Sequence, residues 1–88
     1  MGLTEDRIRD LGYDLQGASA PLANYVPTVS VESLGLVYTA GNLPWRDDKS
    51  LVTGKLGDEI SVDEGYEAAR LAGLSILRVL KAELGELD

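Results

Sequence analysis

Two short segments rich in β-branched and aromatic residues predict a β-hairpin in the first half of the chain. Residues 25–31 (Tyr-Val-Pro-Thr-Val-Ser-Val) and 34–40 (Leu-Gly-Leu-Val-Tyr-Thr-Ala) both favour extended structure, and a tight turn is expected between them at residues 32–35. Pro27 cannot donate a ladder hydrogen bond, so the first strand should be an edge there or begin after it. Residues 51–53 (Leu-Val-Thr) predict a brief third strand.

A long amphipathic helix is predicted in the last third of the chain. Ser61 and Glu64 have the spacing of a capping box, so the helix should begin close to Val62. Residues 67–84 lack proline and are rich in Ala and Leu, and Gly85 supplies a stop. Small or apolar residues recur at steps of three and four: Tyr66, Ala69, Gly73, Ile76, Leu77, Leu80 and Leu84.

A shorter helix is predicted over residues 3–12, with Thr4 as its capping residue. Residues 13–22 are rich in small residues and should cross the surface as a loop. Residues 1–22 therefore form an N-terminal helix and loop extension, and residues 23–88 form the body of the domain.

The apolar stripe of the last helix must be covered by a sheet or by another helix. Gly73 should allow a close approach to the facing strand, and Arg70, Arg78, Lys81 and Glu83 are left to face water. Leu, Ile and Val side chains also occupy most of the remaining circumference, which a three-stranded sheet cannot cover. The chain is therefore expected to pack against a partner, either copies of itself or a complementary chain.

Length and charge narrow the classes of function. Eighty-eight residues make one small domain, and 15 acidic against 8 basic residues give a net charge of −7, which repels phosphate backbones and anionic lipid. Neither nucleic acid nor a membrane is an expected partner. Without Cys or His, the chain has no disulfide, no thiolate nucleophile, no imidazole base and no metal site built on those residues. No run is long enough to cross a bilayer and no leader is evident, so a soluble cytoplasmic protein is expected.

Two polar segments suggest ligand chemistry but have simpler explanations. Asp58, Glu59, Asp63 and Glu64 offer hard oxygen ligands suited to Ca²⁺ or Mg²⁺, yet their spacing matches no EF-hand loop and is typical of solvated acids at a helix N-terminus. Residues 53–57 (Thr-Gly-Lys-Leu-Gly) lack the Ser or Thr that follows the Lys of a phosphate loop, so a turn is predicted.

Trp45 and the two helix arginines also admit two interpretations each. Trp45 lies in a polar loop, where it is either a binding aromatic or a loop anchor over the core. Arg70 and Arg78 lie two turns apart and would either hold an anion or form an ordinary solvated helix face.

The order of four segments resembles the RidA family, also called YjgF, and in particular a divergent branch with a helical N-terminal extension. The segments are residues 20–27 (Ala-Pro-Leu-Ala-Asn-Tyr-Val-Pro), 36–44 (Leu-Val-Tyr-Thr-Ala-Gly-Asn-Leu-Pro), 51–57 (Leu-Val-Thr-Gly-Lys-Leu-Gly) and 61–72 (Ser-Val-Asp-Glu-Gly-Tyr-Glu-Ala-Ala-Arg-Leu-Ala).

The resemblance implies an α+β, chorismate-mutase-like fold, of which this chain has the N-terminal half in the truncated order α-β-β-β-α. Members of the founding branch are hydrolases that convert reactive enamines and imines to a keto acid and ammonia without a cofactor, in clefts between the subunits of a trimer. Others are called endoribonucleases or translation inhibitors. An Arg fork that holds the substrate carboxylate suits this chemistry.

The family pattern implies a ligand site at Tyr25, Gly41 and Asn42, with no catalytic residue and no metal in this chain. The substrate-binding Arg of the family lies in the half that follows and has no counterpart here. Residues 22–24 (Leu-Ala-Asn) and 40–42 (Ala-Gly-Asn) also replace more polar triplets of the founding branch. The expected function is binding or hydrolysis of small carboxylate metabolites. The alternatives are a non-catalytic regulatory oligomer and a fragment without independent activity.

Overall fold

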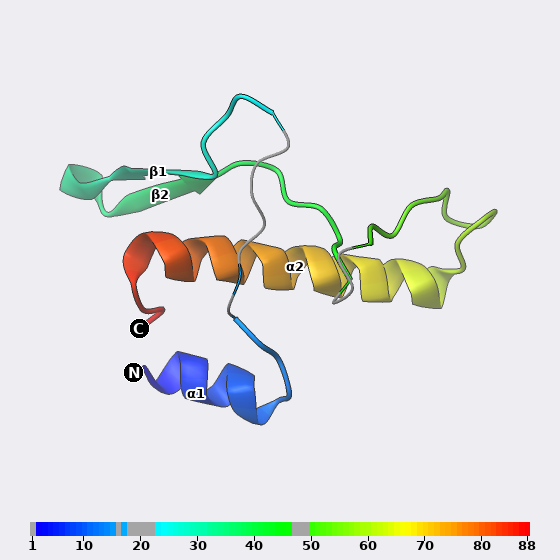
Figure 1. Ribbon diagram of the computed structural model, residues 1–88, viewed down its shortest axis with the longest axis horizontal. Helices are drawn as coiled ribbons and strands as arrows, with labels where there is room; N and C mark the ends of the chain where they lie inside the picture. The colour runs from blue at the N-terminus through cyan, green and yellow to red at the C-terminus, as the bar shows by residue number, and fades with distance from the viewer. Residues whose placement is uncertain (1, 16, 18–22, 47–49) are drawn as a thin grey trace.

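A computed structural model describes residues 2–15, 17, 23–46 and 50–88 (Figure 1). Residue 16 and residues 18–22 of the predicted N-terminal loop lie outside the described residues. The elements follow in the order α1 (Leu3–Asp10), β1 (Thr28–Val31), η1 (Glu32–Leu34), β2 (Leu36–Thr39) and α2 (Val62–Leu84). The hairpin β1–β2 lies over the C-terminal part of α2, and α1 lies on the other side of that helix (Figure 1).

The hairpin is confirmed, and its turn depends on one glycine. β1 pairs antiparallel with β2, with Val29 opposite Tyr38. Gly35 ends the connecting 3₁₀ turn at φ 65°, a left-handed conformation that glycine adopts without strain. β1 begins directly after Pro27, as its missing N–H requires, and the Ala40 N–H donates to the Pro27 carbonyl at 2.9 Å.

The predicted third strand over residues 51–53 is wrong. Leu51 forms only an isolated antiparallel bridge with Trp45, and the sheet of the described residues has two strands. The chain turns back on itself after Gly54, where the N–H groups of Asp58 and Ile60 both donate to the Lys55 carbonyl at 3.1 Å. Backbone groups are thus satisfied within turns instead of a ladder. These bonds belong to a turn at residues 57–59, so the turn predicted over residues 53–57 is displaced toward the C-terminus.

The limits of α2 follow the sequence signals. The Ser61 hydroxyl accepts from the Glu64 N–H and the Glu64 carboxylate accepts from the Ser61 N–H, both at 3.1 Å, which completes the capping box. The helix ends at Gly85, which has φ 84° and donates its N–H to the Lys81 carbonyl.

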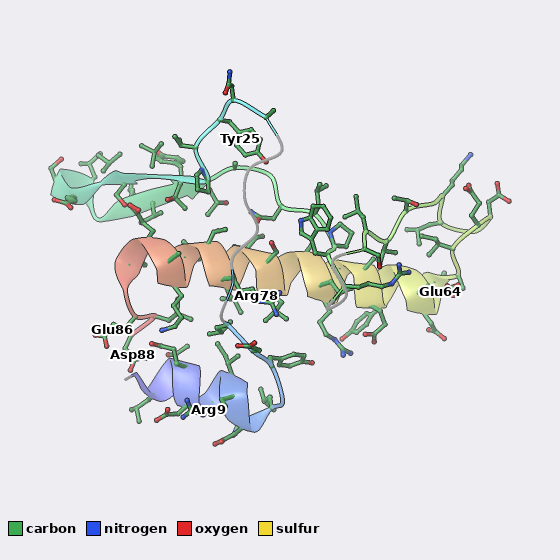
Figure 2. The ribbon with its side chains drawn as sticks, viewed as in Figure 1. Arg9, Tyr25, Glu64, Arg78, Glu86 and Asp88 are labelled. Atoms are coloured by element: carbon green, nitrogen blue, oxygen red, sulfur yellow. The ribbon has the colours of Figure 1, made fainter. Side chains whose placement is uncertain are left out.

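The predicted cap of α1 is wrong. The helix begins at Leu3, so Thr4 is already inside it, and the N-cap Gly2 has no side chain to offer. The Asp88 carboxylate at the other end of the chain accepts hydrogen bonds from the N–H groups of Leu3 and Thr4, the latter at 2.9 Å (Figure 2). Asp88 therefore caps the N-terminus of α1 in place of a residue next to the helix.

The surface predicted for α2 is wrong at two of its four positions. Arg78 and Lys81 are half-buried: Arg78 Nε donates to the Asp14 carbonyl at 2.8 Å, and Lys81 Nζ lies 3.6 Å from a Glu5 carboxylate oxygen. Arg70 and Glu83 are exposed, as predicted, although Glu83 also accepts hydrogen bonds from the Thr28 and Ser30 hydroxyls of the hairpin.

Gly73 does not face a strand. A Cβ added there would meet no atom within 4 Å, and the residue lines a cavity beside the N-terminal segment. The close approach expected from its missing side chain is absent, and open space takes its place.

Little of the apolar surface is buried. The buried hydrophobic residues among those described are Leu15, Ile60, Leu74 and Val79. The radius of gyration is 14.4 Å, whereas a compact domain of this length has about 12 Å. Helix and hairpin therefore expose apolar faces that a compact domain would cover.

Candidate functional site

The residues expected to bind a ligand lie around the open end of the hairpin. The Ala40–Pro27 hydrogen bond holds the segment before β1 against the segment after β2. Tyr25 precedes this bond by two residues and Gly41 follows it, so the fold brings these two positions to one end of the sheet. Gly41 is exposed and Tyr25 is 45% exposed (Figure 2).

Asn42, the third expected residue, ties the loop after β2 to the long helix. Its amide nitrogen donates to the Ala40 carbonyl at 2.9 Å, and its amide oxygen accepts from the Ser75 hydroxyl at 3.0 Å. Ser75 is buried on α2, 33 residues away in sequence. The sequence contains no signal for this pairing, since a serine in an apolar helix stripe has no fixed partner.

Trp45 is half-buried and forms a bridge with Leu51. The backbone N–H of Trp45 donates to the Leu43 carbonyl at 3.0 Å. This placement supports the loop-anchor interpretation of the indole over that of an exposed binding aromatic.

Two of the four clustered acids, Glu59 and Glu64, have local roles near the start of α2. Hydrogen bonds from the Ser61 backbone and side chain lower the pKa of Glu64. Glu59 accepts from the Lys55 N–H at 3.3 Å. Within the part of the chain that the structure describes, no three acidic side chains converge in a way that could hold a metal ion.

Arg70 and Arg78 do not form a joint anion site. Arg70 bonds Glu67 at 2.8 Å and lies 5.8 Å from the centre of the Tyr66 ring. Arg78 binds the Asp14 carbonyl. Because the two side chains have separate partners, they do not bind one anion together, and either guanidinium could contact a ligand only by itself.

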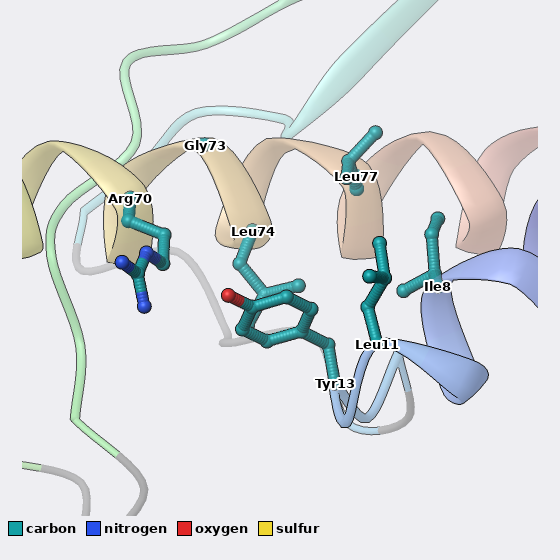
Figure 3. Close-up of a pocket in the computed structure, with 7 residues that line it drawn as sticks. All are labelled: Ile8, Leu11, Tyr13, Arg70, Gly73, Leu74 and Leu77. Carbon is teal, nitrogen blue, oxygen red and sulfur yellow. The ribbon is translucent and has the colours of Figure 1, made fainter.

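A cavity that the sequence did not predict lies between the N-terminal segment and α2 (Figure 3). Its volume is 310 Å³. The lining residues are Ile8, Leu11, Tyr13, Arg70, Gly73, Leu74 and Leu77. The three-residue step from Ile8 to Leu11 was the available signal, but the sequence does not show that α1 packs on this face of α2.

Comparison with known proteins identifies the fold family. The family described as "YjgF/chorismate_mutase-like, putative endoribonuclease" matches residues 5–88. The chain belongs to the YjgF/RidA family. The match begins inside α1, so most of the N-terminal extension is included in it.

Two relatives support this membership. A crystal structure of a "putative endoribonuclease" from Shewanella oneidensis MR-1 superposes with a TM-score of 0.84 at 40% identity, over 94% of this chain and 54% of that one. "Protein TCP17" of Trypanosoma cruzi is 37% identical over 87 residues, which are 99% of this chain and 53% of that protein. The chain therefore spans about half the length of the relatives it matches.

The similarity to a solved structure confirms the α+β, chorismate-mutase-like fold class, with two strands in place of the three expected. In the described part of this YjgF/RidA chain, no helix has the length and apolar character to span a bilayer.

Proposed function

We propose that this YjgF/RidA chain binds small carboxylate metabolites at the open end of its hairpin, in a cleft completed by further polypeptide. The observation that carries the proposal is the Ala40–Pro27 hydrogen bond, which brings the segments of Tyr25 and Gly41 to the same accessible end of the hairpin. A phenol hydroxyl and glycine backbone groups suit a small polar ligand, because glycine lets a ligand approach the main chain closely.

The hairpin supports the second part of the proposal, that other polypeptide completes the cleft. Residues opposite each other in the register share a face, so Val29, Tyr38, Val31 and Leu36 form one apolar face. The other face is directed at α2, where the Thr28 and Ser30 hydroxyls donate to Glu83 at 3.3 and 3.0 Å. The apolar face thus points away from the helix. We propose that the remaining half of the domain, or neighbouring copies in a trimer, covers it.

Binding is favoured over catalysis for this half. The chain contains no His or Cys, and Asn42 already uses its amide for structural bonds. Deamination of enamines or imines needs a group that holds the substrate carboxylate, and no Arg lies among Tyr25, Gly41 and Asn42. Hydrolysis is therefore a second candidate that requires residues from another chain or segment. The net charge of −7 argues against RNA as the ligand.

Titration with pyruvate, 2-ketobutyrate and their amino acids tests the binding proposal. We expect the keto acids to raise the melting temperature in a saturable way. Tyr25→Phe should weaken this binding about fivefold to tenfold, because it removes one hydrogen bond. Tyr66→Phe, which removes an exposed hydroxyl from α2, is the matched control and should change nothing. Absence of any saturable shift would contradict the proposal.

A coupled assay separates binding from hydrolysis. A dehydratase that releases an imine is mixed with the protein, and formation of keto acid is followed. Acceleration by the protein establishes the deaminase, whereas a saturable melting shift without acceleration leaves the non-catalytic function.

A further inference from the structure

The cavity between α1 and α2 lies apart from the hairpin end. α1 and the hairpin lie on different sides of α2, so a ligand in this cavity would not touch Tyr25 or Gly41 (Figures 1 and 3). The family-based ligand site and this cavity are therefore independent features.

The walls of the cavity are apolar and one end is polar. Ile8 and Leu11 of the N-terminal segment face Leu74 and Leu77 of α2. Arg70 lies at one end, and the Tyr13 ring is oriented with its hydroxyl on the side nearer Arg70 (Figure 3). An apolar pocket with a few convergent polar groups is the usual form of a small-molecule site; this one is open to solvent, and its 310 Å³ is at the lower end of the usual size range.

Gly73 keeps the cavity open. A helix interior normally favours alanine, yet glycine stands here and its missing side chain faces free space. No contact with neighbouring atoms requires this glycine, because an added Cβ would meet nothing within 4 Å.

Arg70 is able to hold an anion at the polar end. Its pair with Glu67 is half-exposed, with 45% and 57% of the side chains accessible, and such pairs are weak. The guanidinium has five N–H donors and the pair accounts for one short contact, so a ligand carboxylate can bind without displacing Glu67.

From this arrangement we propose that the α1–α2 cavity binds a free amphipathic molecule with an apolar body and a single carboxylate, such as a medium-chain fatty acid. The apolar body lies against the four aliphatic side chains, and the carboxylate meets Arg70 with the Tyr13 hydroxyl beside it.

The probe is sodium octanoate below its micelle concentration, titrated into the full chain by calorimetry and by NMR of the methyl groups. We expect one site with a dissociation constant below about 1 mM. The perturbed methyl groups should be those of Ile8, Leu11, Leu74 and Leu77. Octylamine, of similar size and opposite charge, should bind at least tenfold more weakly.

Two variants test the two halves of the site, each with a matched control. Arg70→Gln should weaken octanoate binding about tenfold, whereas Arg9→Gln, which removes the same kind of exposed acid–Arg pair from α1, should leave it within twofold. Gly73→Leu should abolish binding by filling the cavity, whereas Ala82→Leu on the exposed surface of α2 should not. Gly73→Ala, which adds only a methyl group, provides a partial block if the larger residue disturbs folding.

Several results would overturn the proposal. They are equal affinity for octylamine, unchanged binding in Arg70→Gln or in both Gly73 variants, and methyl shifts confined to the hairpin.

Discussion

At the scale of single residues, the Asn42–Ser75 pair connects the candidate ligand site to the helix. The Ser75 hydroxyl is buried and donates to the Asn42 amide oxygen. A buried hydroxyl that loses its partner retains the cost of leaving water. Asn42 is therefore a positioning residue for the loop after β2 as well as a candidate contact for a ligand.

Asn42→Ala should lower the free energy of unfolding by about 1–2 kcal/mol, measured by denaturant titration. Asn24→Ala, at an exposed position before the hairpin, should change it by less than about 0.5 kcal/mol. In a double-mutant cycle, adding Ser75→Ala should cost less in the Asn42→Ala background than in the wild type, because the hydroxyl has already lost its acceptor. Strict additivity would show that the bond contributes nothing.

At the scale of elements, α1 is fastened to the end of α2 by a set of polar contacts between the two ends of the chain. Glu5 is buried, accepts the Leu87 N–H at 3.1 Å and lies near Lys81. Asp88 caps the first N–H groups of α1. Hydrogen bonds from Thr4 and Leu3 lower the pKa of the Asp88 carboxyl.

The lowered pKa of Asp88 gives a pH dependence of known sign. The folded state binds this proton less tightly than the unfolded state, so the contribution is complete above the ordinary carboxyl pKa and is lost as the pH falls through the folded value. Asp88→Asn should therefore lower the melting temperature at pH 7, and its difference from the wild type should be smaller at pH 3, which lies below the ordinary carboxyl pKa. Asp58→Asn, on an exposed turn, serves as the control. An equal difference at both pH values would contradict the role of the carboxylate.

At the scale of the whole molecule, the apolar hairpin face should drive association. Tyr38 is 61% exposed and lies opposite Val29, which is 52% exposed. Tyr38→Lys should shift the mass measured by sedimentation toward the monomer. Ser33→Lys adds the same charge at the hairpin turn, outside this face, and should leave the mass unchanged. A wild-type monomer at high concentration would contradict the expectation.

Local signals predicted the ends of elements well. The Ser61–Glu64 capping box, the stop at Gly85 and the start of β1 after Pro27 each depend on residues a few positions apart. The predicted third strand is absent because a strand needs a neighbour, and residues 51–52 have only an isolated bridge to Trp45 and one hydrogen bond to the Pro44 carbonyl.

The features of the site that sequence reasoning missed all join distant parts of the chain. They are the capping of α1 by Asp88, the hydrogen bond between Ser75 and Asn42, and the cavity beside Gly73. Each depends on how the elements pack, which the periodicity of the sequence does not specify. The candidate ligand residues at the hairpin end were predicted from family resemblance, since nothing in residue spacing connects Tyr25 to Gly41.

The contact between Asp88 and the first turn of α1 holds residues 3–4 close to residue 88, so the separation of these two segments measures whether α1 is attached to α2. Fluorescent dyes placed at the two ends would lie within efficient energy-transfer range while Leu3 and Thr4 remain capped. Detachment of α1 from α2 would appear as a loss of transfer, so the state of the cavity beneath that helix becomes visible in a single-molecule trace.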